Sequence, residues 1–161
     1  MSKLNNKGFT LVEVLAVIVI LGIIMAIMAP NVSILLEKSK EDNYEHLEKS
    51  IVSAAKMYIS DYKYKISVVG SCPASGSGTL KIKEIIDGDG IDDNNELTDS
   101  RISIKKLVNE GNLETDNDGN ILNPKDKEQK LNKESSYIEV LYDCDTKGYK
   151  YETPELEWIP K

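Results

Sequence analysis

The chain divides into an apolar N-terminal segment and a longer polar remainder. From Phe9 to Ala29 almost every residue is apolar, and this run is about long enough to cross the hydrocarbon core of a membrane. Glu13 is the only acidic residue inside it, and a carboxylate at such a place costs up to about 3 kcal/mol on insertion scales. The pattern predicts a helix in apolar surroundings that carries one carboxylate in need of a partner.

Helical periodicity resumes beyond Pro30, now with one apolar stripe and polar residues on the other faces. A helix from Phe9 to about Lys65 would be roughly 85 Å long, too long for the small remainder of the chain to cover. The first half, 9–30, must therefore be covered by lipid or by other subunits, whereas 31–66 continues as an amphipathic helix. The stripe consists of Tyr44, Leu47, Ile51, Ala54, Ala55, Tyr58 and Tyr62.

Three residues stand out from the regular pattern of this helix. Gly22 and Pro30 mark its expected weak points, because glycine costs about 1 kcal/mol and proline about 3 kcal/mol in a helix. His46, the only histidine, lies off the apolar stripe. We expect it to be solvated, because a lone imidazole lacks partners for metal binding or base chemistry.

The remaining residues, 67–161, predict a small head with a mainly antiparallel sheet. Thr79–Ile86 alternates enough for a short strand, and Ser136–Asp143 and Gly148–Glu152 form a predicted hairpin. Ser103 is placed to cap a short helix over Ile104–Glu110. The expected fold class is α+β, with a long helix packed against this sheet.

The charges are distributed unevenly along the chain. Lys3 and Lys7 are the only charged residues before the apolar run, which predicts a cytoplasmic N-terminus with the remainder outside. Residues 31–161 carry 18 basic and 26 acidic residues, hence a formal charge of −8. An acidic exterior argues against nucleic acid as a partner.

The two cysteines, Cys72 and Cys144, both fall in the part expected outside, where a disulfide can persist. Pairing them would close a loop of about 70 residues and stabilise the head by about 4 kcal/mol in the chain-entropy model. The alternative is two unpaired thiols.

The stretch 85–96, IIDGDGIDDNNE, resembles the spacing of a calcium-binding loop, with Gly90 at the turn. Oxygen ligands at these intervals suit a hard cation, although Ile85 stands where the first ligand would be. The alternative is a solvated acidic loop. A second acidic segment, Asp116–Gly119, is interpreted as a turn. The candidate calcium ligands are Asp87, Asp89, the Ile91 carbonyl, Asp93 and Glu96.

The segment KGFTLVE closely resembles the processing motif of type IV prepilins and pseudopilins. The resemblance implies that a membrane-embedded prepilin peptidase and methyltransferase removes the leader 1–8. The cut would lie between Gly8 and Phe9, and Phe9 would be methylated. Glu13 would correspond to the family's glutamate, which attracts the positive N-terminus of the preceding subunit during filament assembly.

The resemblance further implies a structural subunit of a type IV pilus or related filament, used for surface attachment or motility. Before assembly the chain would cross the cell membrane once with its head outside, and its partners would be copies of itself and other pilins. A pseudopilin of a secretion or DNA-uptake system is an alternative. So is a monomeric, membrane-anchored, calcium-dependent binding module, and an ordinary secretory signal or plain anchor remains open for the N-terminus. No enzyme is expected, because the sequence shows no nucleophile with a plausible base.

Overall fold

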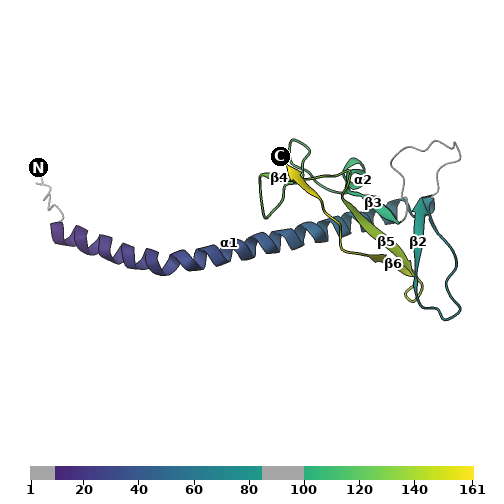
Figure 1. Ribbon diagram of the computed structural model, residues 1–161, viewed down its shortest axis with the longest axis horizontal. Coiled ribbons are helices and arrows are strands. Elements are labelled where there is room, and N and C mark those ends of the chain that lie inside the picture. Colours follow the sequence, from purple (N-terminus) through teal and green to yellow (C-terminus); the bar gives the residue numbers. More distant parts are fainter. Residues whose placement is uncertain (1–9, 85–99) are drawn as a thin grey trace, which may run out of the picture. The chain divides into compact units, whose positions relative to one another are not determined.

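The computed structural model describes residues 10–84 and 100–161, except for the side chains of residues 27–31, 64 and 84. The chain consists of two compact units, Met1–Glu41 and Asp42–Lys161. The second unit, called the head from here on, contains every strand of the described residues (Figure 1).

Helix α1 (Leu11–Asp61) has 51 residues and confirms the predicted long N-terminal helix. It is continuous through Gly22 and Pro30, so the role of these residues as weak points stays a prediction. Within the described residues, no helix combines the length and the hydropathy of a membrane span. The predicted membrane segment 9–30 includes Phe9, which lies outside the described residues.

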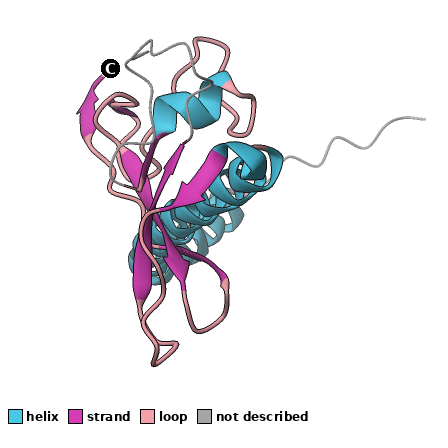
Figure 2. Ribbon diagram, turned by 90° about the vertical axis from the view of Figure 1, so that its right-hand side faces the viewer, coloured by secondary structure: helices cyan, strands magenta, loops and turns pink. Residues whose placement is uncertain are grey.

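The second half of α1 packs against an antiparallel sheet, which confirms the α+β fold class (Figure 2). A short 3-10 turn (Lys63–Lys65) ends the helical region, and a second, two-stranded sheet joins β4 to β7. The head contains β1 (Ile66–Val68), β2 (Thr79–Glu84), β3 (Arg101–Ser103), α2 (Ile104–Asn109), β4 (Gln129–Leu131), β5 (Tyr137–Asp143), β6 (Gly148–Tyr151) and β7 (Trp158–Pro160).

Strand β5 lies at the centre of the larger sheet. β6 pairs with it along one edge, while β2 and then β3 pair with it in succession along the other. Ser100 lies where β3 replaces β2: its carbonyl accepts from the Val140 N–H at 2.8 Å, and its hydroxyl accepts from the Ile82 N–H at 2.8 Å. The residue is fully buried with a φ of 67°. One serine thus provides partners for two backbone groups that the strand exchange would leave unpaired.

The core lies between α1 and the sheet, and the predicted apolar stripe of α1 provides its helical side. Ile51, Ala54, Ala55 and Tyr58 are buried, and Tyr44, Leu47 and Tyr62 are half-buried. Ile59 is also buried, although the stripe did not include it. His46 is exposed, as predicted.

The predicted hairpin and the second helix are confirmed in place. β5 and β6 pair from Asp143–Gly148 to Val140–Tyr151, and the Ser103 hydroxyl accepts from the Lys106 N–H at 3.3 Å. The predicted strand Thr79–Ile86 corresponds to β2, although its last two residues lie outside the described ones. Strands β1, β3, β4 and β7 were not predicted from the sequence, because they have three residues each and are too short to show an alternating pattern.

Candidate assembly segment

The first part of α1 exposes large apolar side chains on every face. Their exposed fractions range from 42% at Ile24 to 85% at Leu11. A helix that is apolar all round is normally buried, and contiguous apolar surface of this kind marks an interaction site. The exposed residues before Met28 are Leu11, Val12, Val14, Leu15, Val17, Ile18, Val19, Ile20, Leu21, Ile23, Ile24 and Met25.

The apolar surface continues past Pro30. Val32, Ile34, Leu35 and Leu36 are each at least half exposed, and Glu37 is the first charged residue after them. Exposed apolar side chains thus also occur beyond the predicted segment 9–30.

Glu13 lies in the first turn of α1 and bonds to Thr10. The N–H and the hydroxyl of Thr10 both donate to Oε2 of Glu13 at 2.9 Å. In return, the Glu13 N–H donates to the Thr10 hydroxyl oxygen at 3.3 Å. This reciprocal pair is a capping box, which provides partners for backbone groups that a helix N-terminus leaves without one. This capping box was not predicted, although T-x-x-E before an apolar run is its signature in a sequence.

The other predicted processing residues, Gly8 and Phe9, lie outside the described residues. The cut between them and the methylation of Phe9 therefore stay predictions. The same holds for the attraction between Glu13 and a neighbouring subunit.

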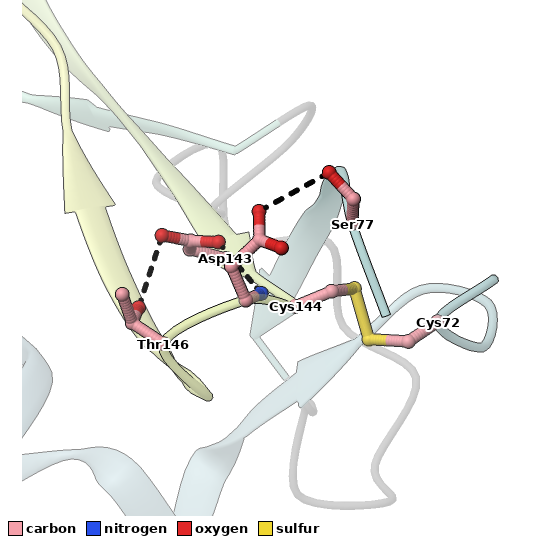
Figure 3. The surroundings of a disulfide bond; sticks show 6 residues. Cys72, Ser77, Asp143, Cys144 and Thr146 are labelled. Atoms are coloured by element: carbon pink, nitrogen blue, oxygen red, sulfur yellow. Dashed lines mark hydrogen bonds between the residues drawn. A yellow bond between two sulfur atoms is a disulfide. The ribbon is translucent and has the colours of Figure 1, made fainter. Parts of the chain in front are cut away.

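Cys72 and Cys144 form a disulfide, with their Cα atoms 5.7 Å apart (Figure 3). The bond joins the exposed connection between β1 and β2 to the turn between β5 and β6. In that turn, Asp143 accepts from the Asp145 N–H at 2.9 Å and from the Thr146 hydroxyl at 3.0 Å. These bonds, the first above all, hold the pKa of the Asp143 carboxyl below its usual value.

The predicted calcium loop, 85–96, lies outside the described residues, so calcium binding stays a prediction. Elsewhere, in 10–84 and 100–161, no three His, Cys, Asp or Glu side chains are grouped to hold a metal ion. The second acidic segment is a turn, as predicted. The Gly119 N–H donates to the Asp116 carbonyl at 2.9 Å, and the Asp116 carboxylate accepts from the N–H groups of Asp118 and Asn120.

Comparison with known proteins identifies the N-terminal segment. Residues 3–29 match the family model described as the prokaryotic N-terminal methylation motif. The chain is similar to the type IV major pilin protein PilA of Myxococcus xanthus (strain DK1622), with 32% identity over 76 residues.

The alignment with that pilin covers 45% of this chain, and the chain spans about a third of the pilin's length, 34%. No solved structure matches the chain. The N-terminal segment thus carries the prokaryotic methylation motif, and over part of its length the chain is similar to a type IV pilin.

Proposed function

We propose that this chain is a prepilin that is cut between Gly8 and Phe9, methylated at Phe9 and polymerised into a type IV pilus or a related filament. A filament of this kind would serve surface attachment or motility. The observation that carries the proposal is the apolar surface on every face of α1 between Leu11 and Met25, which lies within the residues 3–29 that match the methylation motif. These apolar side chains are exposed within the chain, so they need a partner.

The proposed assembly has two stages, each with an apolar environment for this segment. Before assembly, the helix is held in the cell membrane with the N-terminus in the cytoplasm and the head outside. During assembly, the helices of neighbouring subunits replace the lipid, and the heads lie on the outside of the filament. The partners are copies of this chain, other pilins and the prepilin peptidase and methyltransferase.

Glu13 guides the second stage in this proposal. Cutting after Gly8 creates an amine on Phe9, and in apolar surroundings a carboxylate and an ammonium compensate each other, whereas each alone is costly. A subunit whose amine meets Glu13 of its neighbour is therefore held in register along the filament axis.

Mass spectrometry of the mature N-terminus tests the processing. We expect a peptide that begins at Phe9 and carries one added methyl group. A Gly8 variant should retain Met1 and should not assemble. An intact Met1 in the native chain, or a cut beyond Ala26, would contradict the proposal.

The variant Glu13→Gln tests the assembly. Glutamine keeps the shape of the side chain and serves in a capping box as glutamate does, so the start of the helix is preserved and only the charge is lost. We expect normal cutting after Gly8 but filaments reduced by about tenfold or more, as loss of about 1.4 kcal/mol or more at each subunit contact would cause.

Glu37→Gln is the matched control for Glu13→Gln. It removes the same charge from an exposed position of the same helix, beyond the apolar segment, and should leave filaments unchanged. Normal numbers and lengths of filaments from Glu13→Gln, counted by electron microscopy, would contradict the role of Glu13.

A further inference from the structure

Strand β6 forms an open edge of the larger sheet. It pairs with β5 alone, and just after it the Glu152 N–H donates to the Glu139 carbonyl at 3.0 Å. Because backbone groups in an antiparallel pair alternate between the two sides of a strand, the N–H and carbonyl groups of Tyr149 and Tyr151 point away from β5. In the described part of the chain, no backbone hydrogen bond outside the strand pairs involves these two tyrosines. Such an edge is a template for another strand.

The open edge is short, and there is room beside it. The turn before it contains Lys147, whose φ is 52°, and Pro154 after it has no N–H to donate. A groove of about 530 Å³ lies between residues 151–154 and residues 45–56 of α1, so the helix does not fill the space beside Tyr151. The part of the edge that can accept a strand is therefore limited to residues 148–153.

The charges on this edge are self-complementary. Lys150 and Glu152 are two residues apart, hence on the same face of the strand, and their side chains form an ion pair at 2.7 Å. A second copy that runs antiparallel can place its Glu152 opposite Lys150, and the same contact then recurs with the roles exchanged. Opposite charges directly across two strands stabilise their pairing, whereas like charges oppose it. In this register the Tyr151 residues of both copies lie opposite each other, and their outward backbone groups can bond.

We propose that β6 is an interface between two copies of this chain, whose β6 strands pair antiparallel with Lys150 of each copy opposite Glu152 of the other. This pairing goes beyond the proposed function and does not depend on it. One edge of this length is small compared with a stable interface, so the pairing of two single heads is weak. Many heads held in a row would pair far more tightly.

The symmetry of the pair determines where it can occur. A two-fold axis perpendicular to the sheet relates the two heads, and it reverses the direction of the α1 residues that pack on each sheet. In the proposed filament every subunit contacts the next in the same way, so all subunits point in one direction. The β6 pair therefore joins two filaments that run in opposite directions, and only this consequence rests on the proposed function.

The alternative is that Lys150 only keeps other strands away, as charged residues do on many sheet edges. In that case, reversing its charge would not weaken any contact between chains. A mixture of two complementary variants would not restore a contact either. The two roles are therefore separated by experiments on pairs of variants.

The first test measures self-association of the full chain in detergent micelles by sedimentation. Lys150→Glu and Glu152→Lys each place like charges opposite each other in a pair of identical chains, and each should lower the association constant by about tenfold. An equimolar mixture of the two variants has opposite charges at both places and should associate like the native chain. Both variants lose the ion pair within the chain, so recovery in the mixture can come only from contacts between chains.

Lys127→Glu is the control, because it reverses an exposed charge outside β6, and it should associate like the native chain. The apolar helix is the same in all these chains, so differences among them report on the head. Equal association of the native chain, both β6 variants and their mixture would overturn the inference.

The second test checks the register by disulfide formation between chains. Lys150→Cys mixed with Glu152→Cys should form linked dimers, because Cα atoms at such opposite positions are about 4.5 Å apart, within the range of a disulfide. Either variant by itself should form about fivefold fewer dimers, because its two cysteines are offset along the strands. Equal yields with and without mixing would overturn the proposed register.

Electron microscopy separates this inference from the proposed function. Native filaments should lie in bundles, and filaments of Lys150→Glu should lie singly. Bundles of equal size from both would overturn β6 as the interface and leave the proposed function standing. A native chain that forms no filaments would contradict the proposed function, and the two tests in micelles would still decide whether β6 pairs.

Discussion

Glu13 combines two physical roles at one position. Its carboxylate accepts from the first residues of its own helix, and in the proposed filament it also attracts a neighbour's amine. The surrounding sequence FTLVEV places Phe9 and Val14 at the positions of a hydrophobic staple around this capping box. The processing motif therefore also contains the signals that start a helix.

A second residue whose chemistry depends on its surroundings is Tyr151 on β6. Burial raises the pKa of its hydroxyl to about 12, and the neighbouring Tyr149 adds to this effect. The ammonium of Lys56 on α1 lies over the Tyr151 ring, 5.6 Å from its centre. Burial of the Tyr151 hydroxyl, and not the Lys56 contact, favours the neutral form of this tyrosine.

We expect the stability of the head to fall between pH about 10 and about 12, in part because of Tyr151. The folded chain holds the Tyr151 proton more tightly than the unfolded chain, whose tyrosines titrate near pH 10. The stabilisation is therefore complete below pH about 10 and is lost as the pH rises toward 12. Urea unfolding at several pH values should show a smaller decline for Tyr151→Phe than for the native chain. Equal declines would contradict the pKa of about 12.

At the scale of elements, β5 pairs first with β2 and then with β3 along the same edge. The hydrogen bonds of β5 continue across the change of partner strand. Ile82 of β2 would pair next with Val140, but Ser100 lies between them and bonds to both. The left-handed backbone at Ser100, with a φ of 67°, is uncommon for a residue other than glycine. The sheet retains this left-handed backbone because the buried Ser100 hydroxyl is the hydrogen-bond partner of the Ile82 N–H.

Ser100→Ala should destabilise the head by about 1–3 kcal/mol, because the buried Ile82 N–H loses its partner. Ser100→Gly also removes the hydroxyl but relieves the positive φ, so it should cost less than alanine. Urea unfolding can be followed by the fluorescence of Trp158, the only tryptophan, which lies half-buried on β7. Ser75→Ala, in an exposed loop, is the control and should change stability by less than about 0.5 kcal/mol. An alanine variant as stable as the control would contradict the role of the hydroxyl.

At the scale of the whole molecule, the two units differ in how their apolar residues are covered. In Asp42–Lys161 the apolar stripe of α1 packs against the sheet. A disulfide also joins Cys72 to Cys144, which are 72 residues apart in sequence. The apolar side chains of Met1–Glu41 that the structure describes are exposed. The second unit thus has a buried core of its own, whereas the described apolar side chains of the first unit would be covered only in the proposed membrane and filament.

Removal of the disulfide should lower the free energy of unfolding of the head by about 2–4 kcal/mol, because the unfolded chain regains the freedom of a long loop. Cys72 is exposed, so Cys72→Ser tests the bond with little effect on packing. Cys144 is only 5% exposed, and Cys144→Ser should cost more, because it also buries a hydroxyl. Reductant should destabilise the native chain and leave Cys72→Ser unchanged. Equal stability of the native chain with and without reductant would contradict this role.

The sequence alone determined the features that depend on local pattern. The apolar run, the stripe from Tyr44 to Tyr62, the Ser103 cap and the β5–β6 hairpin are all confirmed by the structure. Each of these features follows from the spacing of apolar residues or from the chemistry of a few neighbours. The segment KGFTLVE is local in the same way. Its seven residues were therefore enough to indicate a resemblance to type IV prepilins and pseudopilins.

Only the tertiary structure decided the features that depend on residues far apart in the chain. The three-residue strands exist because a partner strand provides their hydrogen bonds, and their own sequences carry too few alternations to predict them. The same holds for Ser100, which looks like an ordinary loop serine until β2, β3 and β5 meet around it. A pattern along the chain specifies which face of an element is apolar. Which backbone groups pair with each other is determined only when the elements are placed together.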